Sequence, residues 1–392
     1  MTAPVYEQLA ETIALRNEPF GGVCPVVKCT ELWALLEHLF TPEEAEIGAK
    51  MPLNPISAEA LAQEIGRDPK DVEKLLETMA HKGTVVTASS FGVRTAAESG
   101  EGRQYSLIPL MPGAIEHQMV REVVDDRSKE FCRVLQGYFT ALSRLKEAGT
   151  PAATPTFPLS RVAVAEDTIP AGAEILPYDK VSKYVANSDY IMLSTCGCRN
   201  VGKLLGHPCD KPLDVCLGFG KGPVPDSVAS GNSRLISKEE ALKTLDRAEK
   251  AGLVHVITNT SKSIAYCCNC CMDHCMTLRA LKSPVMFAGP APSSFIMVVD
   301  EDECMGCGDC IDRCQFEALS MQDDIVARDA DRCFGCGLCV SVCPTSALRM
   351  EPREQRPTPC ENYGELIQMM AASWRSDPTL PGGDTEYFLV SD

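Results

Sequence analysis

Eight cysteines between positions 304 and 343 constrain this chain more than any other feature. They form two runs with the same C-x2-C-x2-C-x3-C spacing, and the second run is offset from the first by 29 residues. The runs contain, in order, Cys304, Cys307, Cys310 and Cys314, then Cys333, Cys336, Cys339 and Cys343. An alanine–leucine pair follows each run at the same offset, so the two runs are copies of one internal repeat.

This spacing is typical of cysteine thiolates that hold [4Fe–4S] clusters, and in two-cluster proteins the fourth cysteine of each run ligates the other cluster. The sequence therefore predicts two ligand sets: Cys304, Cys307, Cys310 and Cys343 for one cluster, and Cys333, Cys336, Cys339 and Cys314 for the other. Zinc is the alternative, but zinc sites usually pair two C-x2-C knuckles across a longer gap. Gln315 stands where the motif has proline, whereas Pro344 follows the second run.

Residues 295–350 resemble a bacterial ferredoxin module with two [4Fe–4S] clusters, and they make up about one seventh of the chain. The resemblance implies a small pseudo-symmetric domain of short strands and helices. It also implies two clusters that are close enough to exchange single electrons. It does not identify the electron donor or the acceptor.

Length and composition place this module in a larger chain. The 392 residues are enough for two to four domains. No apolar run approaches the ~18 residues of a membrane helix, and the first 16 residues lack the pattern of a signal peptide. Since the cysteine runs need reduced thiolates, we expect a reducing, cytoplasmic location and an anaerobic host. The net charge of −17 argues against general binding to nucleic acid or anionic membranes.

Residues 1–110 predict a short N-terminal helix followed by a helical unit with a two-stranded wing. The expected elements are helices that start at Thr30, Ser57 and Asp68, and strands at 85–89 and 104–108. This order resembles the winged-helix fold, whose third helix often reads DNA. Residues 30–110 contain 13 acidic and 7 basic residues. We therefore expect this unit to contact protein rather than DNA.

Residues 111–150 predict one long helix or two helices in series, because apolar residues recur every three to four positions. The polar stretch 125–128 interrupts this apolar stripe. A continuous helix would span ~55 Å at 1.5 Å per residue, which is long enough to bridge domains or to form a homo-oligomer. Packing into the core of the same chain is the alternative.

Residues 160–283 contain nine further cysteines, and the segments between them predict a compact α/β domain. Strands are expected at 161–165, 190–194 and 253–258, and helices at 178–186 and 238–251. So many cysteines in dense groups exceed what core packing needs. We predict one or two additional iron–sulfur clusters, with zinc as the alternative. The candidate ligands, whose connectivity the spacing does not give, are Cys196, Cys198, Cys209, Cys216, Cys268, Cys270, Cys271 and Cys275.

The motifs Cys196-Gly-Cys198-Arg199 and Cys268-Asn-Cys270-Cys271 are similar to those of iron–sulfur proteins from anaerobic bacteria and archaea. The role of that family is poorly defined, so the resemblance supports metal binding rather than an activity. His274 lies beside these cysteines, and we interpret it as a polar loop residue rather than a ligand. No Rossmann, Walker or Gly-x-Ser-x-Gly motif occurs, so the sequence shows no nucleotide or flavin site.

Residues 351–392 predict a tail with a short helix at 365–374. Together, the patterns predict an α+β multidomain protein with a winged-helix-like start, a long helix, a cysteine-rich middle domain and a ferredoxin-like domain before the tail. The leading hypothesis is an electron-transfer protein or subunit that passes single electrons to a partner oxidoreductase complex, for example a flavoprotein. The alternative is an iron–sulfur, redox-sensing winged-helix transcription regulator. No residue is predicted to be catalytic.

Overall fold

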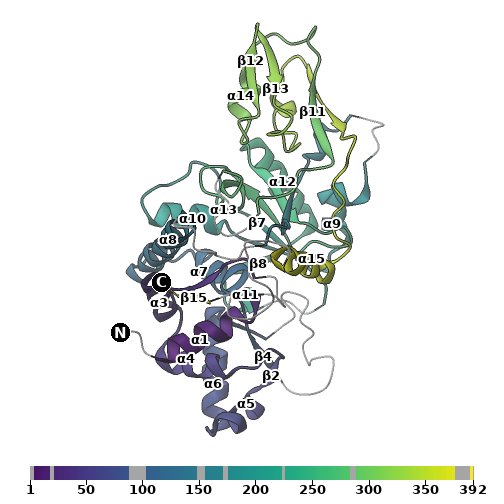
Figure 1. The fold of residues 1–392 in the computed structure, drawn as a ribbon. Coiled ribbons are helices and arrows are strands. Elements are labelled where there is room, and N and C mark those ends of the chain that lie inside the picture. The colour runs from purple at the N-terminus through teal and green to yellow at the C-terminus, as the bar shows by residue number, and fades with distance from the viewer. Residues whose placement is uncertain are drawn as a thin grey trace.

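The computed structural model of the protein describes residues 4–17, 22–87, 103–147, 155–170, 175–222, 226–282, 288–375 and 389–391. Figure 1 shows an elongated molecule, with the N-terminal helices at one end and the module that follows residue 295 at the other. The strands of the middle region lie between these two ends. Within the described ranges, no helix is long and apolar enough to cross a lipid bilayer.

The N-terminal region is mainly helical. Its helices are α1 (Pro4–Ala14), α3 (Thr30–Leu39), α4 (Pro42–Lys50), α5 (Ala58–Ile65) and α6 (Pro69–Lys82). A small sheet with the strand order β2-β4-β3 contains β2 (Ile56–Ser57), β3 (Val85–Val86) and β4 (Gln104–Leu107). The helices expected from residue 30 onwards are present, and the end of the first expected strand, at 88–89, lies outside the described residues. The winged-helix assignment of this region stays a prediction.

Capping explains where α5 and α6 begin and end. The side chain of Ser57 accepts a hydrogen bond of 3.2 Å from a backbone N–H in the first turn of α5, and Asp68 accepts one of 2.9 Å at α6. Both helices end where Gly66 and Gly83 adopt a left-handed backbone, which glycine does at little cost. The starts of both helices agree with the sequence prediction.

Two expectations about helix starts in this region were wrong or incomplete. Thr30 does not cap α3, because Cys29 occupies the cap position and no side chain accepts a capping hydrogen bond there. The helix α4 was not predicted, although Thr41 and Glu44 form a complete capping box at its start. This helix contains few apolar residues, so its apolar pattern is weak. The capping box at Thr41 and Glu44 would have been enough to predict its start.

The segment after β4 forms two helices in series rather than one rod. The π-type turn η2 (Leu110–Ala114) leads into α7 (Ile115–Met119), and α8 (Asp126–Glu147) follows after residues 120–125. The polar interruption noted in the sequence therefore falls at the break. The apolar stripe of α8, which includes Phe131, Leu135 and Tyr138, is buried against α3 in the N-terminal core. This stripe packs within its own chain.

A six-stranded sheet forms the middle region. Its strands are β5 (Ser160–Ala163), β6 (Tyr190–Thr195), β7 (Asp214–Gly220), β8 (Ser233–Ile236), β9 (Val254–Thr258) and β10 (Tyr266–Cys270), in the order β5-β9-β10-β7-β6-β8. Every neighbouring pair is antiparallel, so this region is of the α+β type rather than the expected α/β type. An alternation of strands and helices along the chain does not determine strand direction. The helical elements are η3 (Glu166–Thr168), η4 (Pro177–Asp179), α9 (Val181–Asn187), α10 (Gly197–Leu204), α11 (Asp226–Ala229), α12 (Lys238–Lys250) and α13 (Met276–Arg279).

The C-terminal module consists of two small antiparallel sheets and two short helical turns. One sheet pairs β11 (Phe295–Val299) with β14 (Leu348–Pro352), and the other pairs β12 (Leu319–Gln322) with β13 (Ile325–Arg328). The helical turns are α14 (Asp309–Arg313) and η5 (Val340–Val342), and each lies inside one cysteine run. This arrangement agrees with the pseudo-symmetric module of short strands and helices that the resemblance implies.

The tail returns to the N-terminal region of the same chain. It forms α15 (Tyr363–Arg375), where the sequence predicted a helix, and Leu366 and Met370 of this helix are buried in the N-terminal core. Strand β15 (Leu389–Ser391) pairs in parallel with β1 (Val26–Lys28). The described parts of the tail therefore bind this chain itself.

The helix α10 joins the N-terminal region to the middle sheet. The Asn200 side chain donates hydrogen bonds to the carbonyl oxygens of Met119 (2.8 Å) and Arg121 (2.9 Å). Gly197 allows close contact, since a Cβ at this position would lie 2.7 Å from Met119 Cβ. These contacts position the first turn of α10, where Cys196 and Cys198 lie.

Candidate metal centres

The two cysteine runs form the same loop twice. Gly306 and Gly308 in the first run have φ of +67° and +84°, and Gly335 and Gly337 in the second run have +69° and +83°. Residues with a side chain rarely adopt this conformation. At Gly335 a Cβ would also lie 1.9 Å from the carbonyl oxygen of Phe295. The internal repeat therefore extends to backbone geometry.

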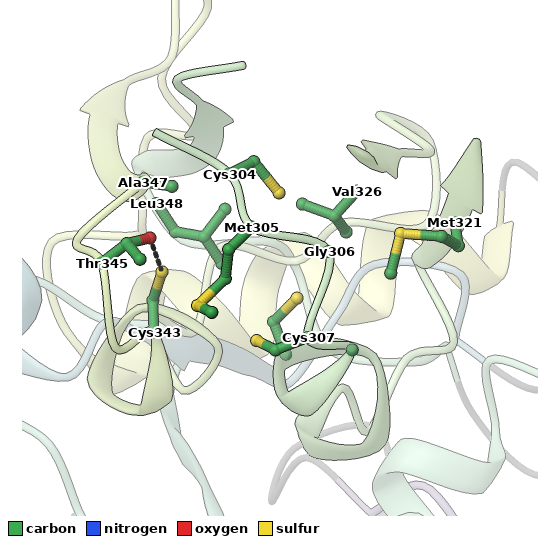
Figure 2. Close-up of a pocket in the computed structure, with 12 residues that line it drawn as sticks. Cys304, Met305, Gly306, Cys307, Met321, Val326, Cys343, Thr345, Ala347 and Leu348 are labelled. Atoms are coloured by element: carbon green, nitrogen blue, oxygen red, sulfur yellow. Dashed lines mark hydrogen bonds between the residues drawn. The ribbon is translucent and has the colours of Figure 1, made fainter. Parts of the chain in front are cut away.

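The first predicted ligand set lines one cavity. The cysteines that border it are Cys304, Cys307, Cys310 and Cys343. Figure 2 labels Cys304, Cys307 and Cys343 among them. Met321 and Val326 of the β12–β13 hairpin contribute apolar walls. Burial, and then the neighbouring thiols, raise the pKa of Cys310 above its ordinary value. Since the four thiols face one space, they are arranged as ligands of one cluster would need to be.

Cys343 differs from Cys310 in its hydrogen bonding. Partial burial favours its neutral thiol, but backbone N–H groups including that of Leu348, together with the Thr345 hydroxyl, outweigh this and lower the pKa of Cys343. The Thr345 oxygen lies 3.7 Å from Cys343 Sγ (Figure 2). Hydrogen bonds of this kind stabilise a thiolate, which is the form that ligates metal.

The second predicted set is also gathered and is more deeply buried. Burial, with the adjacent thiols of Cys314 and Cys333, raises the pKa of Cys336 to about 12. Burial, followed by the neighbouring thiols of Cys336, Cys314 and Cys333, raises the pKa of Cys339 well above its ordinary value. The thiol of Cys310, from the first set, contributes to the same shift. The two ligand sets therefore adjoin each other through Cys310 and Cys339.

Six cysteines of the middle region form a continuous series of neighbouring thiols, in which each thiol shifts the pKa of the next. In spatial order they are Cys196, Cys216, Cys268, Cys270, Cys275 and Cys198. They come from α10, β7, β10 and the residues that cap α10 and α13. Hydrogen bonds from Cys216 and Cys270 lower the pKa of Cys268 to about 6. Hydrogen bonds from Cys198 and Cys270 lower the pKa of Cys275 well below its ordinary value.

Strand periodicity selects the cysteines of β10 that join this series. Cys268 and Cys270 are two residues apart, so they face the same side of the sheet. Cys267 faces the other side and packs into a different apolar cluster. Cys267 and Cys268, which are adjacent in the sequence, therefore lie on opposite faces of β10.

The remaining two candidates lie in a separate group. Cys209 and Cys271 lie together with Asp273 and His274, and the potential ligand atoms of these four residues are all within 4.8 Å of one another. The sequence placed Cys209 and Cys271 with the other candidates, but it did not distinguish this group. The interpretation of His274 as a simple loop residue missed its position among potential ligands.

The buried guanidinium of Arg199 lies between the six-thiol series and this second group. It is 1% exposed, and its Nη atoms donate to the carbonyl oxygens of Asn269 (3.0 Å) and Pro212 (2.8 Å). Nη1 is 3.9 Å from Cys271 Sγ, and Nε has no hydrogen-bond partner within the described residues. Burial alone would lower its pKa, but the thiols of Cys196 and Cys271 raise it overall.

A cation buried in this way is stable only beside negative charge. Here the groups that can supply this charge are thiols, which become negative when they bind metal. The buried Arg199 therefore fits a middle region whose cysteines hold an anionic metal centre. The sequence signal for this role was the arginine that directly follows the Cys-Gly-Cys motif.

The C-terminal module is a 4Fe–4S dicluster domain. The family model of that description matches residues 297–350, which confirms the ferredoxin-type module predicted at 295–350. Iron–sulfur binding and one-electron transfer are the general chemistry of such a domain. Comparison of the chain with curated proteins and with solved structures gave no match. The division of the eight cysteines between the two clusters stays a prediction.

One apolar cluster joins the dicluster domain to the middle thiols. Its cysteines are Cys268, Cys270 and Cys275 of the middle region and Cys314, Cys333 and Cys336 of the domain. The rings of Phe316 and Phe334 stack within it, with centroids 4.7 Å apart. Gln315, which replaces the motif proline, accepts a hydrogen bond of 2.8 Å from the backbone N–H of Met272. The departure from the motif therefore supplies a contact between the two regions.

Proposed function

We propose that this chain is an electron-transfer protein or subunit. It would relay single electrons between its dicluster domain and a further iron–sulfur cluster held by the middle region, and from there to or from a partner oxidoreductase. The apolar cluster shared by Cys314, Cys333 and Cys336 with the middle thiols carries this proposal. Potential ligands of both regions pack into this one apolar cluster. Such proximity is what transfer of an electron from one cluster to the next requires.

The chain's own residues have distinct roles in this proposal. The eight cysteines of the two runs would hold two [4Fe–4S] clusters, and the six-thiol series would hold one more. Bound clusters would supply one-electron transfer. Phe316, Phe334 and Leu338 exclude water from the junction between the domain and the middle thiols. Arg199 would balance the negative charge of the middle ligands.

The first ligand set marks the end of the relay that faces solvent. Cys307 is exposed, and Met305, which lines the same cavity, is 65% exposed. Exposed acidic residues surround this end, namely Glu301, Asp302, Glu303, Asp309, Asp323 and Asp324. We propose that a partner with a basic surface docks there, since complementary charge speeds encounter. The middle thiols would then lie at the inner end of the relay.

The alternative, a redox-sensing transcription regulator, is less well supported. Arg67, Lys82 and Arg103 of the N-terminal region form ion pairs with glutamates of the same region. Cations that are engaged in this way are less available to neutralise DNA phosphates. Sequence-selective binding in a gel-shift assay across a range of salt concentrations would favour the regulator over the relay.

Metal analysis of anaerobically purified protein tests the relay. Two [4Fe–4S] clusters contain eight irons, so we expect more than eight irons per chain, matching acid-labile sulfide, and electron paramagnetic resonance (EPR) signals from interacting clusters on reduction. The Cys314→Ser variant should lose one cluster and slow electron transfer between the middle region and a cationic one-electron acceptor. Cys132→Ala, which changes a buried cysteine of α8, is the matched control. Eight irons or fewer in the wild-type chain would contradict the additional cluster.

A further inference from the structure

Four potential ligands converge beside the middle thiols but do not belong to their series. Cys271 directly follows β10, Asp273 and His274 lie in the turn before α13, and Cys209 comes from the loop between α10 and β7. All four ligand atoms lie within 4.8 Å of one another, and Cys271 Sγ is 4.0 Å from His274 Nδ1. Two separate segments therefore meet at one point, one carrying Cys209 and the other carrying Cys271, Asp273 and His274.

The ring of His274 is oriented as the ring of a metal ligand is. Its Nε2 lies 2.9 Å from the carbonyl oxygen of His207, which can only accept a hydrogen bond. In the neutral imidazole, Nε2 then carries the proton, and Nδ1, which faces Cys271, has a free electron pair. A backbone carbonyl that binds the outer nitrogen in this way is the usual support of a metal-ligating histidine.

The surrounding backbone leaves space for this ring. Gly202 of α10 packs against it, and a Cβ at that position would lie 2.3 Å from His274 Cδ2. On the other side, Nη1 of Arg199 is 3.9 Å from Cys271 Sγ and favours a thiolate there. Both neighbours belong to α10, so this helix shapes the group as well as contributing thiols to the six-thiol series.

We propose that Cys209, Cys271, His274 and Asp273 form a site for a single zinc ion, separate from the ligands of the iron–sulfur clusters. Two thiolates, one imidazole and one carboxylate are a ligand set that suits tetrahedral zinc. Bond lengths of ~2.3 Å to sulfur and ~2.0 Å to nitrogen place those two atoms roughly 3.5 Å apart. The observed 4.0 Å between Cys271 and His274 requires only a small inward shift.

The site goes beyond the electron relay, because zinc does not change its oxidation state. It would fasten the loop that carries Cys209 to the turn that carries His274. That turn leads directly to Cys275 of the six-thiol series, and the loop leads to β7, which carries Cys216. The zinc ion would thus hold two segments that position the middle thiols.

The test measures zinc, iron and sulfide in anaerobically purified full-length chains. We expect about one zinc per chain in the wild type and none in His274→Ala, with iron and sulfide unchanged. His207→Ala is the matched control, because it removes a nearby imidazole and keeps the carbonyl that supports His274, so its zinc should be retained. Cys209→Ser, at a partly exposed position, provides a second variant, and its zinc should also fall.

Cobalt substitution provides an independent readout. Chains prepared with Co²⁺ in place of zinc should show the absorption of a tetrahedral cobalt–thiolate centre, and His274→Ala should lose it. A wild-type chain without zinc would overturn the proposal. So would a His274→Ala chain that loses iron and sulfide, because His274 would then ligate a cluster. Neither result would alter the iron count that tests the relay.

Discussion

Replacement of Arg199 by methionine should lower the reduction potential of the cluster that we propose for the six middle thiols. The guanidinium is buried and acts on the thiols of Cys196, Cys216 and Cys271. Reduction adds one negative charge to the cluster, and a nearby cation stabilises the reduced state more than the oxidised state. Methionine has a similar length and no charge, so the variant should lose this preference.

The expected size follows from Coulomb's law. We take the charge of Arg199 and the charge added to the cluster to be about 8 Å apart. At an effective dielectric constant of about 20, they then interact by about 2 kcal/mol. For a one-electron couple, about 59 mV corresponds to a tenfold change in the equilibrium constant, or about 1.4 kcal/mol. The potential of the middle cluster should therefore fall by roughly 90 mV in Arg199→Met. Arg199→Lys keeps the charge and should shift the potential much less.

An anaerobic redox titration followed by electron paramagnetic resonance measures this shift. The two clusters of the dicluster domain are the internal reference, because Arg199 hydrogen-bonds to residues of the middle region. Iron and sulfide counts equal to those of the wild type show that the variant is loaded. An unchanged potential, or a rise, in a fully loaded Arg199→Met chain would refute the proposed role of this cation.

Three further predictions concern the junction, the buried acid of α7 and the docking end. Gln315→Ala removes the acceptor of the Met272 N–H and should weaken the contact between the dicluster domain and the middle region by about 1–2 kcal/mol. Hydrogen exchange at the Met272 amide should become faster in this variant. Gln315→Glu keeps an acceptor and should not show the faster exchange. Burial raises the pKa of Glu116 to about 7 from 4.5, so its stabilising contribution is complete below pH 4.5 and is lost as the pH rises through 7. Glu116→Gln should therefore be more stable than the wild type at pH 8, by about 1–2 kcal/mol after allowance for partial exposure. Urea unfolding measures the difference in stability between the two proteins, and the same difference at pH 5 and at pH 8 would contradict this prediction. Higher ionic strength should slow electron transfer to a cationic acceptor and leave transfer to a neutral one unchanged, and equal salt dependence for both acceptors would exclude docking at the acidic end.

Local patterns were sufficient for the dicluster domain and for most helix boundaries. Three cysteines within seven residues of each run lie on one short loop, and the repeat shows the same glycine conformations twice. The caps at Ser57 and Asp68 likewise depend on hydrogen bonds between residues two or three positions apart. Predictions of this kind succeed because the interacting groups are neighbours in the chain.

The grouping of the ligands in the middle region could not be predicted in the same way. Its candidate ligands lie up to 79 positions apart, between Cys196 and Cys275, and spacing along the chain does not tell which of them meet. Antiparallel pairing of β7, β9 and β10 brings six thiols into one series and directs Cys267 to the opposite face. The same folding separates Cys209 and Cys271 from that series and places His274 beside them.

The junction between the two metal-binding regions depends on the folded chain as well. The glutamine at position 315 was visible in the sequence only as a missing proline, and its partner Met272 lies 43 positions earlier. Arg199 was visible only as a residue of a motif, and its burial between two groups of thiols depends on α10, β7 and β10 together. Residue order therefore determined which chemistry is present, because cysteine spacing is local. The packing of distant strands and helices determined how the ligands are divided and connected, because contacts between remote residues exist only once the sheet has formed.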